Sequence, residues 1–344
     1  MTDPRATFET LLRAAHAANA SDVHLVPGER PRFRLDDALV PHGEHVFSSD
    51  EIQAIAKEHF GDVRLARQAR EGSAQRPIHL SEGIRARSTL SMTRGHYSIA
   101  VRFNSGPLEL SLERVRAPDV VKEWLGASHG LIVMAGPHGS GKTTTLYAMT
   151  EWLNQNRAVH VCTVEDPLSY EIVSKEALVQ QREVGVDVPT VAAGISAALA
   201  QDLDVLMVAA LADLESLSAV LHAAETGHLV LVQVHANSAD EALERIVEAT
   251  PPSMHAMIRR SLSETLRGVL FQRLVRKPEQ GRVAIYEALA PNDRLLATIA
   301  SGGRLSGLPR GEGSLSMRDD IASLEEDGTL TPEVAAEALA WIRN

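Results

Sequence analysis

The spacing of apolar residues divides the chain into two stretches with different periodicities. Before about residue 104, a stretch of helical spacing is followed by alternating apolar and polar positions. A period near 3.6 predicts a helix and a period of 2 predicts a strand. Predicted strands cover 21–26, 31–35, 84–92 and 97–103, the first two as a hairpin, with helices over 8–19 and from Ser48 onward. This pattern predicts a small α+β domain over residues 1–104.

The pattern changes after residues 105–118, which contain Gly106 and two prolines and are interpreted as a linker. Beyond it, short apolar runs at 131–135, 159–164, 205–208 and 229–234 alternate with helical stretches. Such alternation predicts an α/β domain with a mostly parallel sheet covered by helices on both faces. The domain is expected to span 119–344. Its last third is expected to be helical, with a break at Pro251.

The composition narrows the class of protein. The 344 residues are 44% hydrophobic, enough for packed cores, and the net charge of −11 argues against a general nucleic-acid binder. A single cysteine, Cys162, excludes an internal disulfide and suits a reducing cytoplasm. No signal peptide and no apolar run of roughly 20 residues is visible. We therefore expect a cytoplasmic protein that meets a membrane only through partners.

The run 131–135 is followed by a glycine-rich segment with the pattern G-x-x-x-x-G-K-T, which opens a predicted helix. In this context the backbone N–H groups of such a loop converge on phosphate oxygens. Lys142 is expected to reach the β- and γ-phosphates of ATP, and the Thr143 hydroxyl to bind Mg²⁺. The predicted nucleotide-binding residues are Gly136, Pro137, His138, Gly139, Ser140, Gly141, Lys142, Thr143 and Thr144.

An ordered series of motifs extends over nearly the whole chain. It comprises S-D-V-H-L at 21–25, G-P-H-G-S-G-K-T-T-T-L at 136–146, V-E-D-P at 164–167, E-T-G-H-L-V at 225–230 with H-A-N-S-A at 235–239, and Q-R-L at 272–274 with G-R-V-A-I-Y-E at 281–287. This series resembles the secretion ATPases, and within them the retraction ATPases of type IV pili (PilT-like), whose phosphate loop reads G-P-T-G-S-G-K.

The resemblance implies a PAS-like N-terminal domain followed by a RecA-like P-loop NTPase domain with a helical C-terminal region. It further implies ATP hydrolysis coupled to pilus movement (twitching motility) and a ring of six subunits. An inner-membrane pilus platform protein is the implied partner, so the expected location is the inner face of the membrane, held there by partners.

The chain departs from the family where the Walker B motif reads roughly D-V-(I/L)-x-(I/V)-G-E-(M/I)-R-D. Ala209, Ala210 and Ala212 replace the glycine, the catalytic glutamate and the arginine, and only Asp213 remains at the end. The segment 232–236 reads V-Q-V-H-A instead of S-T-L-H-T, and of the retraction-type A-I-R-N-L-I-R-E segment only Arg294 and Leu296 remain. Impaired hydrolysis is expected, and retraction as the specific task is less supported.

Another acid could replace the missing glutamate. Asp202 and Asp204 precede the run 205–208 and would lie roughly 15 Å from the carboxyl end of that strand. Asp213 is expected to begin the following helix. Glu165 follows the run 159–164 at the carboxyl end of a strand predicted to lie next to the phosphate loop. It is assigned the residual catalytic role.

Four further residues complete the predicted site. His235 ends the run 229–234, where a neutral imidazole can respond to the phosphate state of the nucleotide. The resemblance implies that Arg85, Arg87 and Arg102 approach the nucleotide across subunits of the ring, although a solvated basic strand face is the simpler interpretation.

Two hypotheses for function remain open. The first is a motor subunit that hydrolyses ATP weakly through Glu165, in a homo-hexamer or a mixed hexamer with a related ATPase. The second is a hydrolysis-deficient, nucleotide-gated paralogue that regulates or co-assembles with an active pilus motor. An unrelated kinase or GTPase is disfavoured, because the motif series is absent from those classes and no N-K-x-D motif is present.

Overall fold

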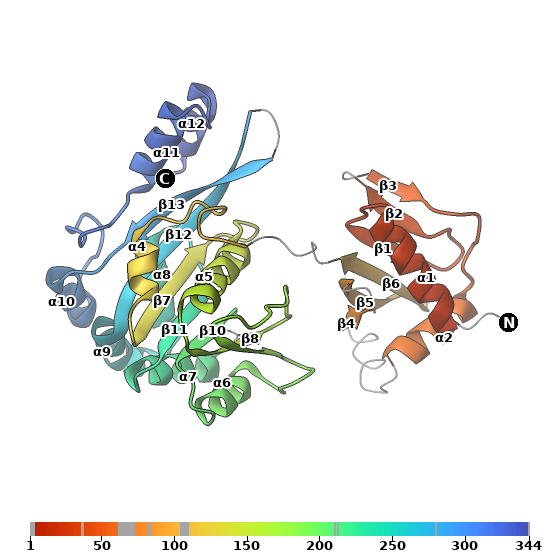
Figure 1. The fold of residues 1–344 in the computed structure, drawn as a ribbon, viewed down its shortest axis with the longest axis horizontal. Helices are drawn as coiled ribbons and strands as arrows, with labels where there is room; N and C mark the ends of the chain where they lie inside the picture. The colour runs from red at the N-terminus through yellow and green to blue at the C-terminus, as the bar shows by residue number, and fades with distance from the viewer. Residues whose placement is uncertain are drawn as a thin grey trace. The chain divides into compact units, whose positions relative to one another are not determined.

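The computed structural model of the protein describes residues 4–35, 38–60, 73–80, 84–103, 110–209, 211, 213–278 and 281–342. The chain forms two compact units, Met1–Leu108 and Glu109–Asn344, which are each described by themselves (Figure 1). The division falls inside the segment 105–118 interpreted as a linker. Leu112, within that segment, is buried in the core of the second unit.

The first unit is an antiparallel sheet of strand order β3-β2-β1-β6-β5-β4 packed against two helices. Val23, Phe33 and Val101 point to the helix side and pack with residues of α1 and α2. Helix α2 begins where Ser48 and Glu51 exchange hydrogen bonds, an N-terminal capping box. The elements are α1 (Pro4–Ala17), β1 (Asp22–Leu25), β2 (Arg32–Leu35), β3 (Ala38–Pro41), α2 (Ser49–Phe60), β4 (Ser73–His79), β5 (Arg85–Thr93) and β6 (His96–Phe103).

The sequence pattern did not predict strands β3 and β4. All four residues of β3 are exposed, so the alternation that marks a half-buried strand is missing. Strand β4 contains Pro77, which lacks the N–H that a ladder position uses. Each of these strands lies at an edge of its sheet, where pairing on one side is sufficient.

The second unit is built on a seven-stranded sheet of order β13-β12-β7-β11-β10-β8-β9, parallel except for β13. The predicted mostly parallel sheet is confirmed. The elements up to α8 are α4 (Val120–Leu125), β7 (Gly130–Gly136), α5 (Lys142–Asn156), β8 (His160–Glu165), β9 (Leu178–Glu183), α6 (Val191–Leu199), β10 (Val205–Val208), α7 (Leu214–Glu225), β11 (Leu229–His235) and α8 (Ala239–Glu248). They are followed by η1 (Pro252–Met254), α9 (His255–Thr265), β12 (Leu266–Arg276), β13 (Arg282–Leu289), α10 (Asp293–Ser301), α11 (Met317–Glu326) and α12 (Pro332–Ala340).

Successive residues of the buried strands enter two separate cores on the two faces of this sheet. In β7, Leu131 and Val133 pack on the side of α6, α7, α8 and α9, whereas Ile132 and Met134 pack on the side of α4 and α5. Because side chains alternate along a strand, a run that is apolar at every position is covered on both faces. The helix layers of Figure 1 follow from this pattern.

The expectation of a helical C-terminal third is wrong in one respect. Helices α8 to α12 are present, but β12 and β13 form a long antiparallel pair between them and extend the sheet beside β7. Residues 266–276 are apolar at most positions, with Arg267, Gln272 and Arg273 interspersed, so neither period stands out. Pairing with β7, which sequence spacing does not reveal, decides in favour of the strand.

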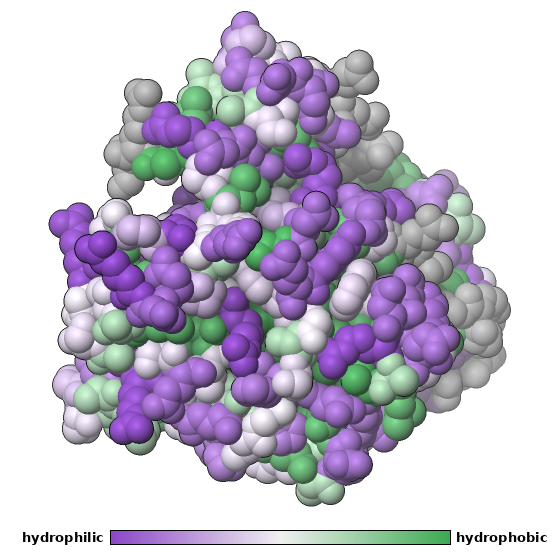
Figure 2. Space-filling model, turned by 60° about the vertical axis from the view of Figure 1, so that its left-hand side comes forward, coloured by the Kyte–Doolittle hydropathy of each residue, from purple (hydrophilic) through white to green (hydrophobic). Residues whose placement is uncertain are grey.

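On the face drawn in Figure 2, hydrophobic residues occur in small groups among hydrophilic ones. Within the described ranges, no helix is both long enough and apolar enough to span a bilayer.

Candidate nucleotide-binding site

The predicted phosphate loop connects the end of β7 to the start of α5, as the sequence indicates. Gly139 and Gly141 have φ values of 72° and 85°, a left-handed conformation that glycine adopts at little cost. At Gly136, a Cβ atom would lie 2.4 Å from the Gln272 carbonyl oxygen and 2.6 Å from Ser140 Oγ. Neighbouring chain therefore fills the space around the loop, and a side chain at Gly136 would displace it.

Gln272 of β12 braces this loop from the neighbouring strand. Its Nε2 donates to the Ser140 carbonyl oxygen at 2.7 Å, and its Oε1 accepts from Thr145 Oγ1 at 2.7 Å. The residue is 2% exposed, so both hydrogen bonds are shielded from water. The motif at 272–274 indicates no role for Gln272, and the pairing of β7 with β12 reveals that it braces the loop.

Lys142 lies folded into the loop, where its Nζ donates to the carbonyl oxygens of Gly136 at 2.9 Å and Pro137 at 2.7 Å. Burial without a carboxylate partner lowers the pKa of Lys142 to about 8. Ser140 Oγ is also buried and makes no hydrogen bond within the described part of the chain. A costly buried cation and an unpaired hydroxyl in a glycine cradle fit a polyphosphate, which would supply acceptors to both.

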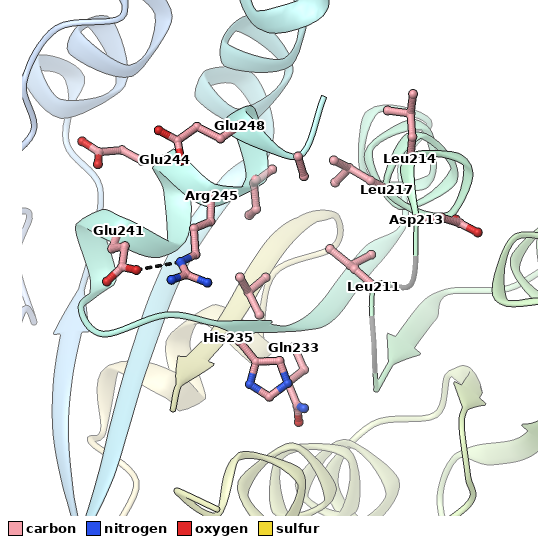
Figure 3. Close-up of a pocket in the computed structure, with 13 residues that line it drawn as sticks. Leu211, Asp213, Leu214, Leu217, Gln233, His235, Glu241, Glu244, Arg245 and Glu248 are labelled. Carbon is pink, nitrogen blue, oxygen red and sulfur yellow. Dashed lines mark hydrogen bonds and ion pairs between the residues drawn. The ribbon is translucent and has the colours of Figure 1, made fainter. Parts of the chain in front are cut away.

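The end of β11 supplies two further polar side chains. Gln233 Oε1 accepts from Thr143 Oγ1 at 3.2 Å, so the hydroxyl predicted to hold Mg²⁺ has a partner on this strand. His235 Nδ1 lies 3.3 Å from Lys142 Nζ, and Figure 3 shows Gln233 and His235 on the opposite side of the strand from Arg245 and Glu241. Thr144, the last of the predicted loop residues, lies in the first turn of α5, which begins at Lys142.

The pKa of His235 is lowered. Part of the ring is covered, which disfavours its charged form, and the nearby Lys142 and His138 act in the same direction. The imidazole is therefore neutral at neutral pH in this arrangement, as the sequence interpretation assumed.

The segment after β10 is where the family motif predicts a catalytic acid and the sequence has Ala210. Ala209 follows the strand, and Ala210 and Ala212 lie outside the described residues. Asp213 caps α7: its Oδ1 accepts from the Ser216 N–H at 2.8 Å, and this hydrogen bond lowers the pKa of the carboxyl group. At the other end of the strand, Asp204 accepts from the His160 N–H at 2.8 Å. Asp213 and Asp204 thus both lie where the sequence predicted, and each carboxylate has a local structural partner.

The position assigned to Glu165 needs correction. Glu165 ends β8, but β11 and β10 lie between β8 and β7, so its strand is not next to the phosphate loop. The apolar runs predicted parallel strands but not their order.

The Glu165 carboxylate is fully buried within a polar network. It accepts from Tyr147 of α5, from Thr163 Oγ1 at 2.6 Å and from Gln181 Nε2 at 3.3 Å. The Tyr147 hydroxyl in turn accepts from the N–H groups of Ser169 and Tyr170 at 3.1 Å each. Burial raises the pKa of Glu165, and its donors oppose that rise. Tyr147 was not predicted as a site residue, because it lies in an otherwise apolar stretch of α5.

A cavity of about 710 Å³ adjoins this edge of the sheet, between the start of α7 and α8 (Figure 3). It shares Gln233 and His235 with the loop site, and its lining combines aliphatic residues with acidic ones. Its lining residues are Leu211, Asp213, Leu214, Leu217, Gln233, Val234, His235, Glu241, Glu244, Arg245, Ile246, Glu248 and Ala249. Among the described residues, no group of three or more His, Cys, Asp or Glu side chains could hold a metal ion.

The predicted arginines lie on the sheet of the first unit. Arg102 Nε donates to Asp22 Oδ1 at 2.8 Å, and 77% of the Arg102 side chain is exposed. Arg87 stands opposite Arg102 in the register of β5 and β6. Arg85 belongs to β5, but its side chain lies outside the described residues.

A phosphate loop between a central parallel strand and a helix defines the chain as a P-loop nucleotide-binding protein with a RecA-like domain. Residues 5–299 match the family described as Type II/IV secretion system protein, and the chain belongs to this family. Within the secretion ATPases it is PilT-like.

Three similar proteins support this assignment. The uncharacterized protein YggR of Escherichia coli K12 is 35% identical over 302 residues, which cover 88% of this chain and 91% of that protein. The type IV pilus retractation ATPase PilT of Pseudomonas aeruginosa PAO1 is 33% identical over 284 residues, 81% of each chain. The crystal structure of the pilus retraction motor PilT with bound ADP matches with a TM-score of 0.83 and 32% identity, over 95% of each chain.

Proposed function

We propose that this protein is an ATP-binding motor subunit of a type IV pilus or type II secretion-like system, with weak ATP hydrolysis. The observation that carries the proposal is the complete, braced phosphate loop in a chain similar to a pilus retraction ATPase. The proposed assembly is a ring of six, homomeric or mixed, that acts at the inner face of the membrane through a platform protein.

Binding rests on the loop. Backbone N–H groups of residues 136–144 would hold the phosphates, Lys142 would neutralise them, and Thr143 would hold Mg²⁺ after exchanging its partner Gln233. Mg²⁺, when bound, would neutralise phosphate charge. Lys142 is buried beside two carbonyl oxygens and the His235 ring, none of which carries a negative charge, so a bound anion would stabilise its ammonium group.

Hydrolysis is weak for two reasons. A positioned carboxylate that orients the attacking water contributes about 10²–10⁴ in rate, and Ala210 stands where the family has that glutamate. Turnover then depends on the carboxylate of Glu165, but this group already accepts hydrogen bonds from Tyr147, Thr163 and Gln181. Only conformations that release Glu165 from these donors would turn over.

Arg85, Arg87 and Arg102 are proposed to complete the site across a subunit boundary, where a guanidinium stabilises transition-state charge. Arg87→Ala should lower turnover at least tenfold with an unchanged melting temperature of the monomer. Arg94→Ala, in the tight turn between β5 and β6, is the matched control. Equal turnover in both variants would contradict a role for Arg87 in the site of a neighbouring subunit.

A second candidate is favoured by the burial of Glu165 together with Ala210. In that case the chain binds ATP, does not hydrolyse it, and regulates or co-assembles with an active pilus motor. ATP would then set its conformation rather than drive a stroke.

Sedimentation of the purified chain tests the proposed assembly. With saturating MgAMP-PNP, we expect a shift from smaller species to a ring, and no shift for Lys142→Ala. A chain that stays monomeric with bound nucleotide would contradict a homomeric ring; ring formation only after a related ATPase is added would favour the second candidate.

A further inference from the structure

Tyr147 connects the helix that follows the phosphate loop to the carboxylate at the end of β8. Its side chain is fully buried on α5, and its hydroxyl donates to Glu165 Oε2. The same hydroxyl oxygen accepts from the N–H groups of Ser169 and Tyr170 at 3.1 Å each. The rings of Tyr147 and Tyr170 also pack edge to face, with their centroids 4.9 Å apart. These contacts fix both the phenol and the carboxylate that it contacts.

The second oxygen of Glu165 is held from two strands. Its Oε1 accepts from Thr163 Oγ1 at 2.6 Å, within β8, and from Gln181 Nε2 at 3.3 Å, on β9. Gln181 is itself tied to the segment after β8, because its Nε2 donates to the Tyr170 carbonyl oxygen at 2.8 Å and its Oε1 accepts from the Ile172 N–H at 2.7 Å. Donors from α5, β8 and β9 thus hold one carboxylate group.

This network lies one helical turn from the phosphate loop. Thr143 and Tyr147 are four residues apart on α5, so they lie on the same side of the helix, about 6 Å apart along its axis. Thr143 is the residue proposed to hold Mg²⁺, whereas the Glu165 carboxylate is held beside Tyr147. Because Glu165 is fully buried, a water molecule reaches its carboxylate only after the network opens.

We propose that Tyr147, together with Thr163, is a positioning residue that restrains Glu165, so that ATP turnover is limited by the release of this carboxylate. The proposal rests on the proposed residual role of Glu165 and deepens it. Removal of the phenolic donor shifts the balance toward conformations in which Glu165 is free to orient a water molecule. One hydrogen bond to a charged group corresponds to a factor of about ten in such a balance. A tyrosine that served packing alone would give no gain, because phenylalanine keeps the ring contact with Tyr170.

Steady-state MgATP hydrolysis by the full chain, measured well below the melting temperature, tests this restraint with Tyr147→Phe. We expect kcat to rise about five- to tenfold with an unchanged affinity for MgAMP-PNP, since the phosphate loop keeps its contacts. The melting temperature should fall, because the N–H groups of Ser169 and Tyr170 lose a partner. Tyr286→Phe is the matched control: its buried hydroxyl donates to the Val115 carbonyl oxygen at 2.6 Å, and its loss should lower the melting temperature without raising kcat.

The double variant Tyr147→Phe with Glu165→Gln separates the restraint from a general loosening of the fold. It should turn over as slowly as Glu165→Gln alone, because the gain depends on the carboxylate. An unchanged or lower kcat in Tyr147→Phe, or a gain that persists in the double variant, would overturn the restraint.

Two further variants keep the outcome decisive. If Tyr147→Phe does not fold, Thr163→Val decides by the same criterion, because it removes the donor to the other carboxylate oxygen with little change in volume. Unchanged turnover in Glu165→Gln alone would overturn the proposed role of Glu165 itself, whatever the effect of Tyr147→Phe.

Discussion

Strands β7 and β10 end at the same edge of one sheet, yet they lead into segments of different chemistry. After β7 comes a phosphate loop held in place by Gln272, with Lys142 buried inside it. After β10 come Ala209 and Leu211, and then Asp213, which caps a helix. Phosphate binding uses many backbone groups and one cation, whereas hydrolysis depends on a single positioned carboxylate. A chain can therefore lose the second property and keep the first.

The largest effect is expected from Lys142→Ala, which removes the cation of the phosphate loop after β7. MgAMP-PNP should bind at least about 100-fold more weakly, because charge-assisted contacts to phosphate are the strongest in such a site. Fluorescence titration with a labelled analogue measures this. Lys122→Ala alters a half-buried lysine of α4 that pairs with Glu113, and this variant should bind like the wild type. Similar affinity for both variants would mean that the nucleotide binds elsewhere.

Glu165→Gln tests whether ATP turnover depends on the carboxylate at the end of β8, the strand beside β10. We expect turnover to fall about 100-fold with unchanged MgAMP-PNP affinity, since a carboxylate that handles the attacking water is lost. Glutamine retains one acceptor oxygen for Tyr147, but its NH₂ group faces the donors Thr163 and Gln181, so a lower melting temperature is expected and turnover is measured well below it. Glu151→Gln, which alters another hydrogen-bonded carboxylate, on α5 itself, is the control. Unchanged phosphate release in Glu165→Gln would remove Glu165 from the site.

Ala209→Gly combined with Ala210→Glu restores the glycine and the glutamate of the family's Walker B motif after β10. Steady-state phosphate release should rise at least about tenfold, a fraction of the full contribution of a positioned base, because the arginine at position 212 is still absent. The variant with Ala210→Gln in place of Ala210→Glu matches its size without the charge and should stay at the wild-type rate. If the glutamate variant gains nothing, the missing acid is not what limits turnover.

The smallest effect is expected from Gln272→Ala, which removes the brace of the phosphate loop but no phosphate contact. The Ser140 carbonyl and the Thr145 hydroxyl would lose buried partners, at a cost of about 1–3 kcal/mol in the free energy of unfolding. Nucleotide affinity should fall only a few-fold. Urea denaturation and the same titration measure the two quantities. Gln155→Ala, at an exposed position on α5, should change neither.

The sequence predicted the features that depend on local chemistry. The glycines and Lys142 of the loop, the alternation of buried strands with helices, and the capping role of Asp213 all follow from residues close together in the chain.

Features that depend on strand order were not predictable in the same way. The separation of Glu165 from the phosphate loop by two strands, and the brace from Gln272, arise from pairings between segments up to about 130 residues apart. Tyr147 was missed because a buried hydroxyl looks like core packing until its partner Glu165 is located.

The central claim, that binding is retained while hydrolysis is limited, is tested most directly by steady-state MgATP hydrolysis of the purified chain against Lys142→Ala. The account predicts slow phosphate release by the wild type that disappears in the variant. Phosphate release that persists in Lys142→Ala, or none in a wild type that binds MgAMP-PNP, would contradict it.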